Sequence, residues 1–399
     1  MSFSNGLEKR PRLRFPGFDE PLAKFEIGNA CEQLKETIDP RTTPTEFYAE
    51  YSMPAFDNNR KVAKVQGKDM NSARKVMSKP CVLINKLNVR KKRIWLVDHP
   101  EKNAVSSTEF VPLSSTMMSL GYLNYVALTD RFTNYMLNCS SGSSNSQKRV
   151  TPDDILDYVI TAPSLLEQER IARFLETIDS KIRAQEDLIE LLKKYKRGVT
   201  AKLIAAIEEK YPVVKLGEYV TVMRGSSPRP IDAYLTNSEE GVRWIKIGDT
   251  QPDKLYITET KERIKPEGVK KSRRVYEGDL ILSNSMSFGR PYILKVDGCI
   301  HDGWLLIRDK KHKFDKRFLC FYLASDSTLT QYKKYAAGSC VNNLNSELVA
   351  SVEIGMPPID QQIHVADILE KVDRQVQALS TMYSLLNRVR SALLQQLFI

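Results

Sequence analysis

The sequence predicts an α+β fold. Two similar β-rich globular domains are joined by two long helices, which pair as an antiparallel coiled coil with a pseudo-twofold axis. Three observations predict this architecture: the chain repeats itself, each repeat ends in an apolar heptad pattern, and the segments between these patterns hold short strands broken by Gly, Asn and Ser. The length of 399 residues suits two or three domains.

The internal repeat appears when the sequence is shifted by 194 residues. Residues 163–205 then align with residues 357–399, and 10 of these 43 pairs are identical. The segments that precede the helices also begin alike, with Ile27-Gly28 in one and Leu216-Gly217 in the other. A repeat of this length predicts a duplicated unit of one domain followed by one helix. Identical pairs include Pro163/Pro357, Gln168/Gln362 and Asp179/Asp373.

Both repeated segments carry apolar residues at 4-3 spacing over more than four heptads, which indicates a coiled coil. Prolines at 163 and 357–358 mark the helix starts. We expect the two helices to pair within one chain; pairing between two chains is the alternative. Lys196 and Arg390 stand at equivalent seam positions, and we expect both to reach solvent at the ends of the rod. The alternative is that these polar groups fix the register of the helices at a cost in stability. The expected seam residues are Ile171, Leu175, Ile178, Ile182, Ile189, Leu192, Val365, Leu369, Val372, Val376, Leu386 and Leu393.

Shifts in composition predict the domain boundaries. We expect a first domain at 1–160 with a flexible arm at 1–20, and a spacer helix at 161–210. A second domain at 211–355 and a C-terminal helix at 356–399 complete the chain. Short β-like runs at 81–84, 93–97, 242–247, 279–282 and 291–294 place strands in both domains.

Positive charge gathers in the two expected domains. The chain has a formal net charge of +11, of which +5 falls in residues 1–160 and +5 in residues 211–355. Such an excess favours a polyanionic partner, although any single basic run is as well explained as a solvated surface. Equivalent basic runs occur in both domains, which favours DNA as the polyanionic partner over a merely solvated surface.

The residue types in these runs suit contact with DNA. Lys and Arg neutralise phosphates, Arg and Asn pair with the edges of guanine and adenine, and Gly-Ser loops offer backbone N–H groups. The candidate DNA-binding residues of the first domain are Asn58, Arg60, Asn85, Lys86, Asn88, Arg90, Lys91, Lys92, Arg93, Ser143 and Ser144. Those of the second domain are Ser226, Ser227, Arg229, Lys270, Lys271, Arg273, Arg274, Asn284, Ser285, Ser287, Arg290, Ser339 and Asn342.

Several chemistries lack their sequence motifs. The chain has no GxxxxGK[ST] phosphate loop, no GxGxxG dinucleotide fingerprint and, with four histidines, no HExxH zinc motif. It also lacks the Asn/Asp-Pro-Pro-aromatic loop expected of an adenine methyltransferase. Residues 1–17 contain no apolar core of a secretory signal, and no apolar run approaches the roughly 20 residues of a membrane span. Six cysteines without a CxxC pair indicate reduced thiols in an intracellular protein.

One string imitates a nuclease. Asp253, Glu259 and Lys261 resemble the carboxylate–carboxylate–lysine set that binds Mg²⁺ in some nucleases. The spacing is short and such a pattern is common by chance, so a nuclease is an alternative and not the main hypothesis. We therefore expect no catalytic residue and no metal site in this chain.

The second half of the chain, residues 213–399, resembles one half of the specificity subunit of Type I restriction-modification systems. The resemblance rests on the order of several strings rather than on one motif. The first half shows the same frame in residues 163–171 and in its Gly-Ser loop at 142–144. The matching strings of the second half are Val-Lys-Leu-Gly-Glu at 214–218, Arg-Gly-Ser-Ser-Pro at 224–228, Arg-Trp-Ile-Lys-Ile-Gly-Asp at 243–249, Gly-Asp-Leu-Ile at 278–281, Gly-Arg at 289–290, Gly-Ser at 338–339 and Pro-Pro-Ile-Asp-Gln-Gln at 357–362.

The resemblance implies two target recognition domains, each reading one half of a split, asymmetric site in double-stranded DNA. It implies that the helices form an antiparallel spacer and dock two methyltransferase subunits, joined in some complexes by motor-nuclease subunits. S-adenosylmethionine would then belong to the methyltransferase partner, and ATP and Mg²⁺ to the motor-nuclease partner, with no cofactor on this chain. Such a protein is cytoplasmic, associated with the nucleoid of a bacterium or archaeon, and has no membrane partner. Two further hypotheses are a stand-alone DNA-binding regulator and a purely structural coiled-coil protein.

Overall fold

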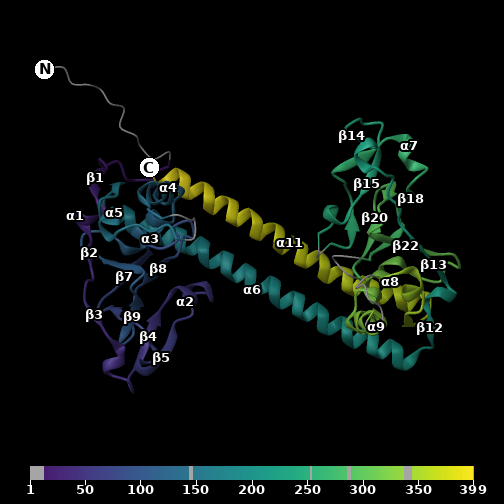
Figure 1. Ribbon diagram of the computed structural model, residues 1–399, viewed down its shortest axis with the longest axis horizontal. Helices are drawn as coiled ribbons and strands as arrows, with labels where there is room; N and C mark the ends of the chain where they lie inside the picture. The colour runs from purple at the N-terminus through teal and green to yellow at the C-terminus, as the bar shows by residue number, and fades with distance from the viewer. Residues whose placement is uncertain (1–12, 143–146, 252–253, 285–288, 337–343, 399) are drawn as a thin grey trace. The chain divides into compact units, whose positions relative to one another are not determined.

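The computed structural model describes residues 13–142, 147–251, 254–284, 289–336 and 344–398. The chain divides into two compact units. The first unit comprises Met1–Arg183 and Ser384–Ile399, and the second comprises Ala184–Tyr383. Each unit contains one β-rich domain and part of both long helices, α6 (Leu165–Lys210) and α11 (Ile359–Leu397), which Figure 1 draws in teal and yellow. Among the described residues, none of the helices combines the length and the apolar character that a membrane span requires.

The first domain runs from β1 to β11 and holds two sheets (Figure 1). One sheet has the order β2-β10-β7-β8, and the other has the order β3-β6-β9-β4-β5, in which β4 and β9 are parallel. A separate antiparallel pair joins β1 (Ala23–Glu26) to β11 (Val159–Ala162). The sheet strands are β2 (Glu32–Gln33), β3 (Thr37–Ile38), β4 (Phe47–Tyr51), β5 (Ala63–Gln66), β6 (Arg74–Val76), β7 (Cys81–Asn85), β8 (Ile94–Val97), β9 (Ala104–Ser107) and β10 (Phe110–Ser114). The helices are α1 (Ile27–Ala30), α2 (Met53–Asp57), α3 (Leu120–Leu128), α4 (Asp130–Cys139) and α5 (Pro152–Leu156).

The second domain runs from β12 to β23. Its sheets have the orders β13-β22-β19-β20-β16 and β14-β17-β15-β21-β18, and β12 (Val213–Lys215) pairs with β23 (Glu353–Gly355). The sheet strands are β13 (Val220–Arg224), β14 (Leu235–Thr236), β15 (Val242–Ile245), β16 (Tyr256–Ile257), β17 (Glu262–Ile264), β18 (Arg273–Val275), β19 (Leu280–Ser283), β20 (Pro291–Leu294), β21 (Gly298–Ile300) and β22 (Trp304–Asp309). The helices are α7 (Pro266–Val269), α8 (Lys316–Leu323), α9 (Asp326–Ala336) and α10 (Ser346–Ala350).

The two domains share the order of their central strands, so the duplication extends beyond the helices. Among the described strands, the edge strands β3, β14 and β16 have no counterpart in the other domain. Strands β10-β7-β8 correspond to β22-β19-β20, the parallel pair β4–β9 corresponds to β15–β21, and the terminal pair β1–β11 corresponds to β12–β23. The strand run predicted at 242–247 ends at Ile245, because Ile247–Asp249 form a 3-10 turn. Its counterpart in the first domain is β4, although the two strands share no recognisable sequence.

One glycine in each domain allows the same close contact. A Cβ atom on Gly28 would lie 3.2 Å from the Cβ of Leu156, and one on Gly217 would lie 2.9 Å from the Cβ of Ala350. Leu156 and Ala350 end α5 and α10, and the 194-residue shift relates them. The absence of a side chain therefore lets each domain pack its last short helix against the turn that follows its first strand.

The long helices pair antiparallel within each unit. In the second unit, Gln185 donates to the carbonyl of Leu379 at 3.1 Å, and the Lys196 ammonium pairs with Asp373 at 2.5 Å. Because the partner's number falls as the α6 number rises, the two helices run in opposite directions. This result confirms intramolecular pairing.

The same ion pair recurs in the first unit, where the Arg390 guanidinium pairs with Asp179. The 194-residue shift relates Lys196 to Arg390 and Asp373 to Asp179, so the two pairs are repeat equivalents. The expectation that Lys196 and Arg390 reach solvent is therefore wrong. Each cation meets a carboxylate across the seam, which fixes the register of the two helices.

Nine of the predicted seam residues are buried, and Leu192, Leu386 and Leu393 are half-buried. The heptad pattern changes near the end of α6, where Ile204 and Ile207 are buried and Ala206 is exposed. The change occurs because this end of α6 joins the hydrophobic core of the second domain. The nine buried residues are Ile171, Leu175, Ile178, Ile182, Ile189, Val365, Leu369, Val372 and Val376.

A buried glutamine attaches each long helix to its domain. The Gln168 amide donates to the Pro163 carbonyl at 2.9 Å and accepts from the Ser119 N–H at 3.0 Å. The Gln362 amide donates to the Pro357 carbonyl at 2.9 Å and accepts from the Asp315 N–H at 2.9 Å. Ser119 and Asp315 are the N-caps of α3 and α8. The repeated Pro and Gln residues therefore form the same joint twice.

The N-terminal segment packs against α6 from residue 14 onwards. The Arg14 guanidinium binds the buried Glu167 carboxylate at 2.7 Å, Phe15 meets Phe174 edge to face, and Phe18 is buried. The predicted flexible arm at 1–20 is wrong for residues 14–18, because the ion pair of Arg14, the aromatic contact of Phe15 and the burial of Phe18 hold this segment. Residues 1–12 lie outside the described residues. The five described cysteines are free thiols, as expected.

Candidate nucleic-acid interface

Two equivalent loops carry many of the predicted DNA-binding residues. The first loop, residues 86–93, joins β7 to β8, and the second loop, residues 284–290, joins β19 to β20. The Lys86 carbonyl accepts from the Val150 N–H at 3.0 Å, and the Asn284 carbonyl accepts from the Leu344 N–H at 3.1 Å. The 194-residue shift relates Val150 to Leu344. The two loops therefore occupy the same place in the duplicated frame.

Three predicted residues of the first domain are used inside it. Asn85 is 3% exposed and its amide donates to the Leu87 carbonyl. Arg93 is buried and forms a two-pronged pair with Asp57 at 2.6 and 2.9 Å. The Lys92 ammonium donates to the Leu128 carbonyl at 2.8 Å. The prediction that these residues contact DNA is therefore corrected: they shape the loop, and their polar groups are satisfied within the domain.

Other predicted residues of the first domain remain accessible. Arg90 and Lys91 are exposed in the first loop, and Asn58 is exposed at the end of α2. Arg60 is exposed, with its guanidinium 5.0 Å from the centre of the Phe56 ring. Lys86 and Asn88 are half-buried, and Asn88 adopts the left-handed backbone region at φ 54°.

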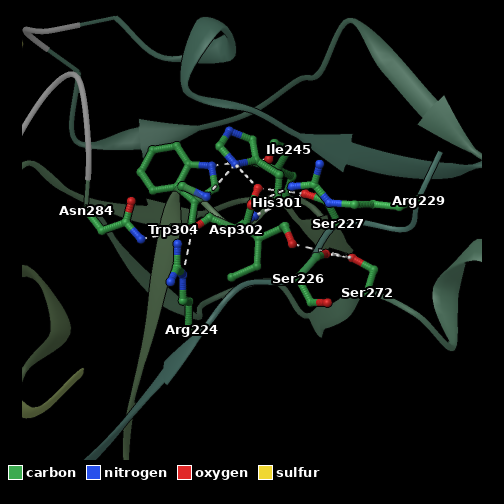
Figure 2. A network of polar contacts seen from close by, with 12 residues as sticks. Arg224, Ser226, Ser227, Arg229, Ile245, Ser272, Asn284, His301, Asp302 and Trp304 are labelled. Atoms are coloured by element: carbon green, nitrogen blue, oxygen red, sulfur yellow. Dashed lines mark hydrogen bonds and ion pairs between the residues drawn. The ribbon is translucent and has the colours of Figure 1, made fainter. Parts of the chain in front are cut away.

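In the second domain, a polar network fixes the loops at the ends of the strands (Figure 2). Its centre is Asp302, between β21 and β22. The Ser227 hydroxyl donates to the Asp302 carboxylate at 2.8 Å, and the Arg229 guanidinium donates to it at 3.2 Å. The Asp302 carbonyl accepts from the Asn284 amide at 2.9 Å and from Arg224 Nε at 3.2 Å. Asn284 is 3% exposed, so its predicted DNA contact is also corrected.

The contacts of this network determine the protonation states of Asp302 and His301. Burial alone would raise the pKa of Asp302, but hydrogen bonds from Ser227 and the backbone, with the nearby charges of His301 and Arg229, lower it below its ordinary value. Burial lowers the pKa of His301. The imidazole is therefore neutral near pH 7, and its Nδ1 accepts from the Gly303 N–H at 2.6 Å. Asp302 thus provides an anionic anchor beneath a basic surface.

A glycine brings two of these loops together. A Cβ on Gly225 would lie 2.0 Å from the His301 carbonyl oxygen, so only glycine fits at this position. On the opposite side of the loop, the Ser226 hydroxyl donates to the Lys271 carbonyl at 2.9 Å. The Arg-Gly-Ser-Ser-Pro string at 224–228 is therefore a structural clamp. Both serine hydroxyls donate to protein atoms, and their contact with DNA stays a prediction.

The cations around this clamp divide into engaged and accessible groups. Lys271 donates to the Tyr234 hydroxyl at 2.5 Å, and Arg273 donates to the Arg224 carbonyl at 3.1 Å. The Arg274 guanidinium lies 5.8 Å from the centre of the Tyr276 ring. Lys270 and Arg290 are exposed, and the Arg229 side chain is 78% exposed despite its contact with Asp302. Lys270, Arg290 and Arg229 therefore have the best access to a ligand.

Sequence reasoning missed Asp302, His301 and Arg224, because the clamp joins residues that are far apart along the chain and belong to no basic run. Six predicted residues lie outside the described residues: Ser143, Ser144, Ser285, Ser287, Ser339 and Asn342. The same holds for Asp253 of the nuclease alternative, whereas Glu259 is exposed. In the part of the chain that the structure describes, no three His, Cys, Asp or Glu side chains are grouped to hold a metal ion.

Comparisons with known proteins agree with this architecture. Residues 208–387 match the family model described as the Type I restriction modification DNA specificity domain. This part of the chain is therefore a DNA specificity domain. The chain is similar to specificity subunits of Type I restriction-modification systems.

Two relatives come from Methanocaldococcus jannaschii. A protein named as the MjaX specificity subunit is 27% identical over 250 residues, 57% of this chain and 55% of its own length. The MjaVIII specificity subunit is 25% identical over 295 residues, 66% of this chain and 68% of its own length. The crystal structure of the Type I system S subunit from M. genitalium covers 98% of this chain and 99% of its own, with a TM-score of 0.64 and 15% identity. That likeness shows the shared fold.

Proposed function

We propose that this chain binds a bipartite, asymmetric site in double-stranded DNA, one half per domain, and scaffolds the adenine methyltransferase subunits of a Type I complex. One observation carries the proposal: two domains with the same order of central strands present equivalent loops with different exposed cations. Chemistry would then belong to the partners, with S-adenosylmethionine on the methyltransferase. ATP and Mg²⁺ would belong to any motor-nuclease subunit that joins.

The difference between the loops supports an asymmetric site. The first loop exposes Arg90 and Lys91, whereas the second loop exposes Arg290 and the segment after β13 exposes Arg229. An arginine can pair with the O6 and N7 atoms of guanine, and each good pair contributes about 1–3 kcal/mol of discrimination. Two loops with different side chains therefore select different half-sites.

The experiment is to map methylated adenines across a host genome that carries this chain or its variants. Arg90→Ala is expected to relax only the half-site read by the first domain, and Arg290→Ala only the other, by about 1–3 kcal/mol per lost base contact. Equal relaxation of both halves by either variant would contradict the proposal. Purification without any methyltransferase would favour a stand-alone regulator.

The paired helices support a fixed spacing between the half-sites. Two linked domains gain affinity only where both half-sites lie at the separation that the linkage allows. Insertion of one heptad into both α6 and α11 adds about 10 Å of helix. We expect this to increase the preferred spacer by about 3 base pairs. An unchanged spacer in the selected sites would show that the helices do not measure it.

Two exposed apolar triplets support docking of two methyltransferase subunits. Leu188, Leu191 and Tyr195 on α6 are 41–62% exposed, and their spacing places them on one helix face. The 194-residue shift maps them onto Met382, Leu385 and Val389 on α11, which are 42–49% exposed. Exposed apolar clusters mark interaction sites, and two equivalent triplets suit two copies of one partner.

Substitution of an apolar residue by aspartate tests each of the two triplets by itself. Leu191→Asp and Leu385→Asp are each expected to reduce the methyltransferase content of the complex from two copies to one, as measured by native mass spectrometry. Leu166→Asp is the matched control, because Leu166 is 57% exposed on α6 outside both triplets. Two retained copies in both variants would show that the partner binds elsewhere.

A further inference from the structure

We infer that a basic groove in the second unit binds the phosphate backbone of DNA, and that the spacer helix α6 supplies part of this site. The inference rests on the proposed DNA-binding function and extends it to the helix. The groove has a volume of about 790 Å³. It is lined by the helices α6, α8, α9 and α11, by the start of β20, by the end of the second loop and by the segment before β16, all within the second unit.

The charged side chains that line the groove are mainly cationic. Six Lys and Arg side chains line it, against three carboxylates. Two of these carboxylates already have cationic partners, since Asp373 pairs with Lys196 at 2.5 Å and Glu190 lies 3.6 Å from Lys193. Asp326 begins α9 and is the third. The groove therefore keeps a positive excess after its internal pairs are formed.

Four cations supply this excess: Arg197, Lys254, Arg290 and Lys333. All four are exposed, and none forms an ion pair with another residue that the structure describes. They come from four separate elements, and none of them is buried. Exposed cations without a buried donor among them suit the solvent-exposed DNA backbone better than a small anion.

The groove is continuous with the second loop. Arg290 ends that loop, and the preceding Gly289 has a left-handed φ of 73°. A Cβ on Gly289 would lie 3.0 Å from Cδ2 of Tyr332, a buried side chain of α9 next to Lys333. The close packing of Gly289 on Tyr332 joins the loop to α9. A DNA strand held by the loop is therefore well placed to continue along α9 and α6.

The first unit lacks the corresponding charges on its helix. The 194-residue shift places Asn387 where Lys193 stands and Ser391 where Arg197 stands. The α11 face equivalent to the groove side of α6 is therefore uncharged at these two positions. We expect the helix contribution to phosphate binding to be confined to the second unit.

The test measures how DNA affinity of the full-length chain depends on salt, using fluorescence anisotropy and a duplex that contains the mapped site. The variants are Arg197→Gln, Lys333→Gln and the double substitution. Arg197→Lys retains the charge, and Lys194→Gln removes an exposed lysine of α6 that does not line the groove. Each lost phosphate contact is expected to lower the magnitude of the slope of log K against log[salt] by about 0.9, and the affinity about five- to tenfold near 0.1 M salt.

The double variant is expected to lower the slope by about 2, equally on DNA with and without the site, while Arg197→Lys and Lys194→Gln match the wild type. A slope in the double variant equal to that of Lys194→Gln would overturn the inference, as would a loss confined to the specific site. Loss of methyltransferase binding at an unchanged DNA slope would instead assign the groove to a protein partner. Failure of the wild-type chain to prefer its site would contradict the proposed function itself, which distinguishes the two failures.

Discussion

The two domains share the order of their central strands but stabilise their loops with different side chains. In the first domain, Asn85 shapes the loop and Glu109 binds Arg149 at 2.8 Å. In the second domain, the Asp302 carboxylate binds Ser227 and Arg229. The comparison shows that strand pairing fixes where a loop lies, whereas local side chains fix its shape. Some basic and amide residues in such loops therefore hold the shape of the loop, and others are left accessible for binding.

The two copies are most alike where each domain meets its helix. Gln168 and Gln362 make equivalent hydrogen bonds, and Asp179 and Asp373 accept equivalent cations. Both copies must begin a helix, attach it to a domain and match it to an antiparallel partner. Because both copies must satisfy the same packing requirements, the identical residues are concentrated in this part of the repeat.

The largest expected effect tests the equivalence of the two joints. Gln362→Ala is expected to lower the free energy of unfolding by about 3 kcal/mol, and Gln168→Ala by about 2 kcal/mol, because buried hydrogen-bonding groups lose their partners. Gln362 has the larger value since it also donates to the Lys313 carbonyl at 3.0 Å. Hydrogen exchange of α8 reports the stability of the Gln362 joint, and hydrogen exchange of α3 reports that of the Gln168 joint. Protection equal to that of the wild type in both variants would show that the two glutamines do not stabilise these joints.

A smaller effect is expected at the two glycines that precede the sheets. Gly217→Ala would bring a Cβ within 2.9 Å of Ala350, whereas Gly28→Ala leaves 3.2 Å to Leu156. We expect losses of about 2 and 1 kcal/mol respectively, because overpacking costs about 1–3 kcal/mol. Gly198→Ala on α6, where no atom lies within 4 Å of the new Cβ, is the control and is expected to be neutral or stabilising. Thermal unfolding of the three variants measures these losses, and we expect the largest loss for Gly217→Ala and none for Gly198→Ala.

The smallest expected effect is a pH-dependent contribution of Asp302 to the stability of the second domain, which has no equivalent in the first domain. The folded-state pKa of Asp302 is lowered, so its ionised form stabilises the second domain above the ordinary carboxyl pKa of about 4. That stability disappears as the pH falls through the lowered pKa. Because the side chain is 43% exposed, Asp302→Asn is expected to cost less than about 1 kcal/mol at pH 7, and nothing once the pH lies below the lowered pKa of Asp302.

The first domain supplies the control for this titration. Its corresponding position is Thr108, so Thr108→Ala is expected to show no pH dependence. Urea unfolding between pH 3 and pH 7 compares the two variants. A pH-independent difference for Asp302→Asn would show that the carboxylate charge does not hold the clamp.

About half of the candidate site could be predicted from the sequence. Arg90, Lys91, Arg229, Lys270 and Arg290 are exposed, as expected of DNA-binding residues. Arg93, Asn85 and Asn284 are buried, because each meets a partner that the local sequence does not identify. A charge run shows that cations are present, but their accessibility depends on carboxylates and carbonyls brought near by distant strands.

The sequence by itself determined the duplication, the two long helices and their apolar seam, because periodicity and repetition are local properties that survive without tertiary contacts. Only the tertiary structure decided that Lys196 and Arg390 bind carboxylates across the seam, that Asp302 holds the second domain's loops, and that Arg197 lines a groove with Arg290. Each of these joins residues from separate elements. Hydrogen bonds, ion pairs and grooves of this kind exist only after strand pairing and helix pairing have brought those elements together.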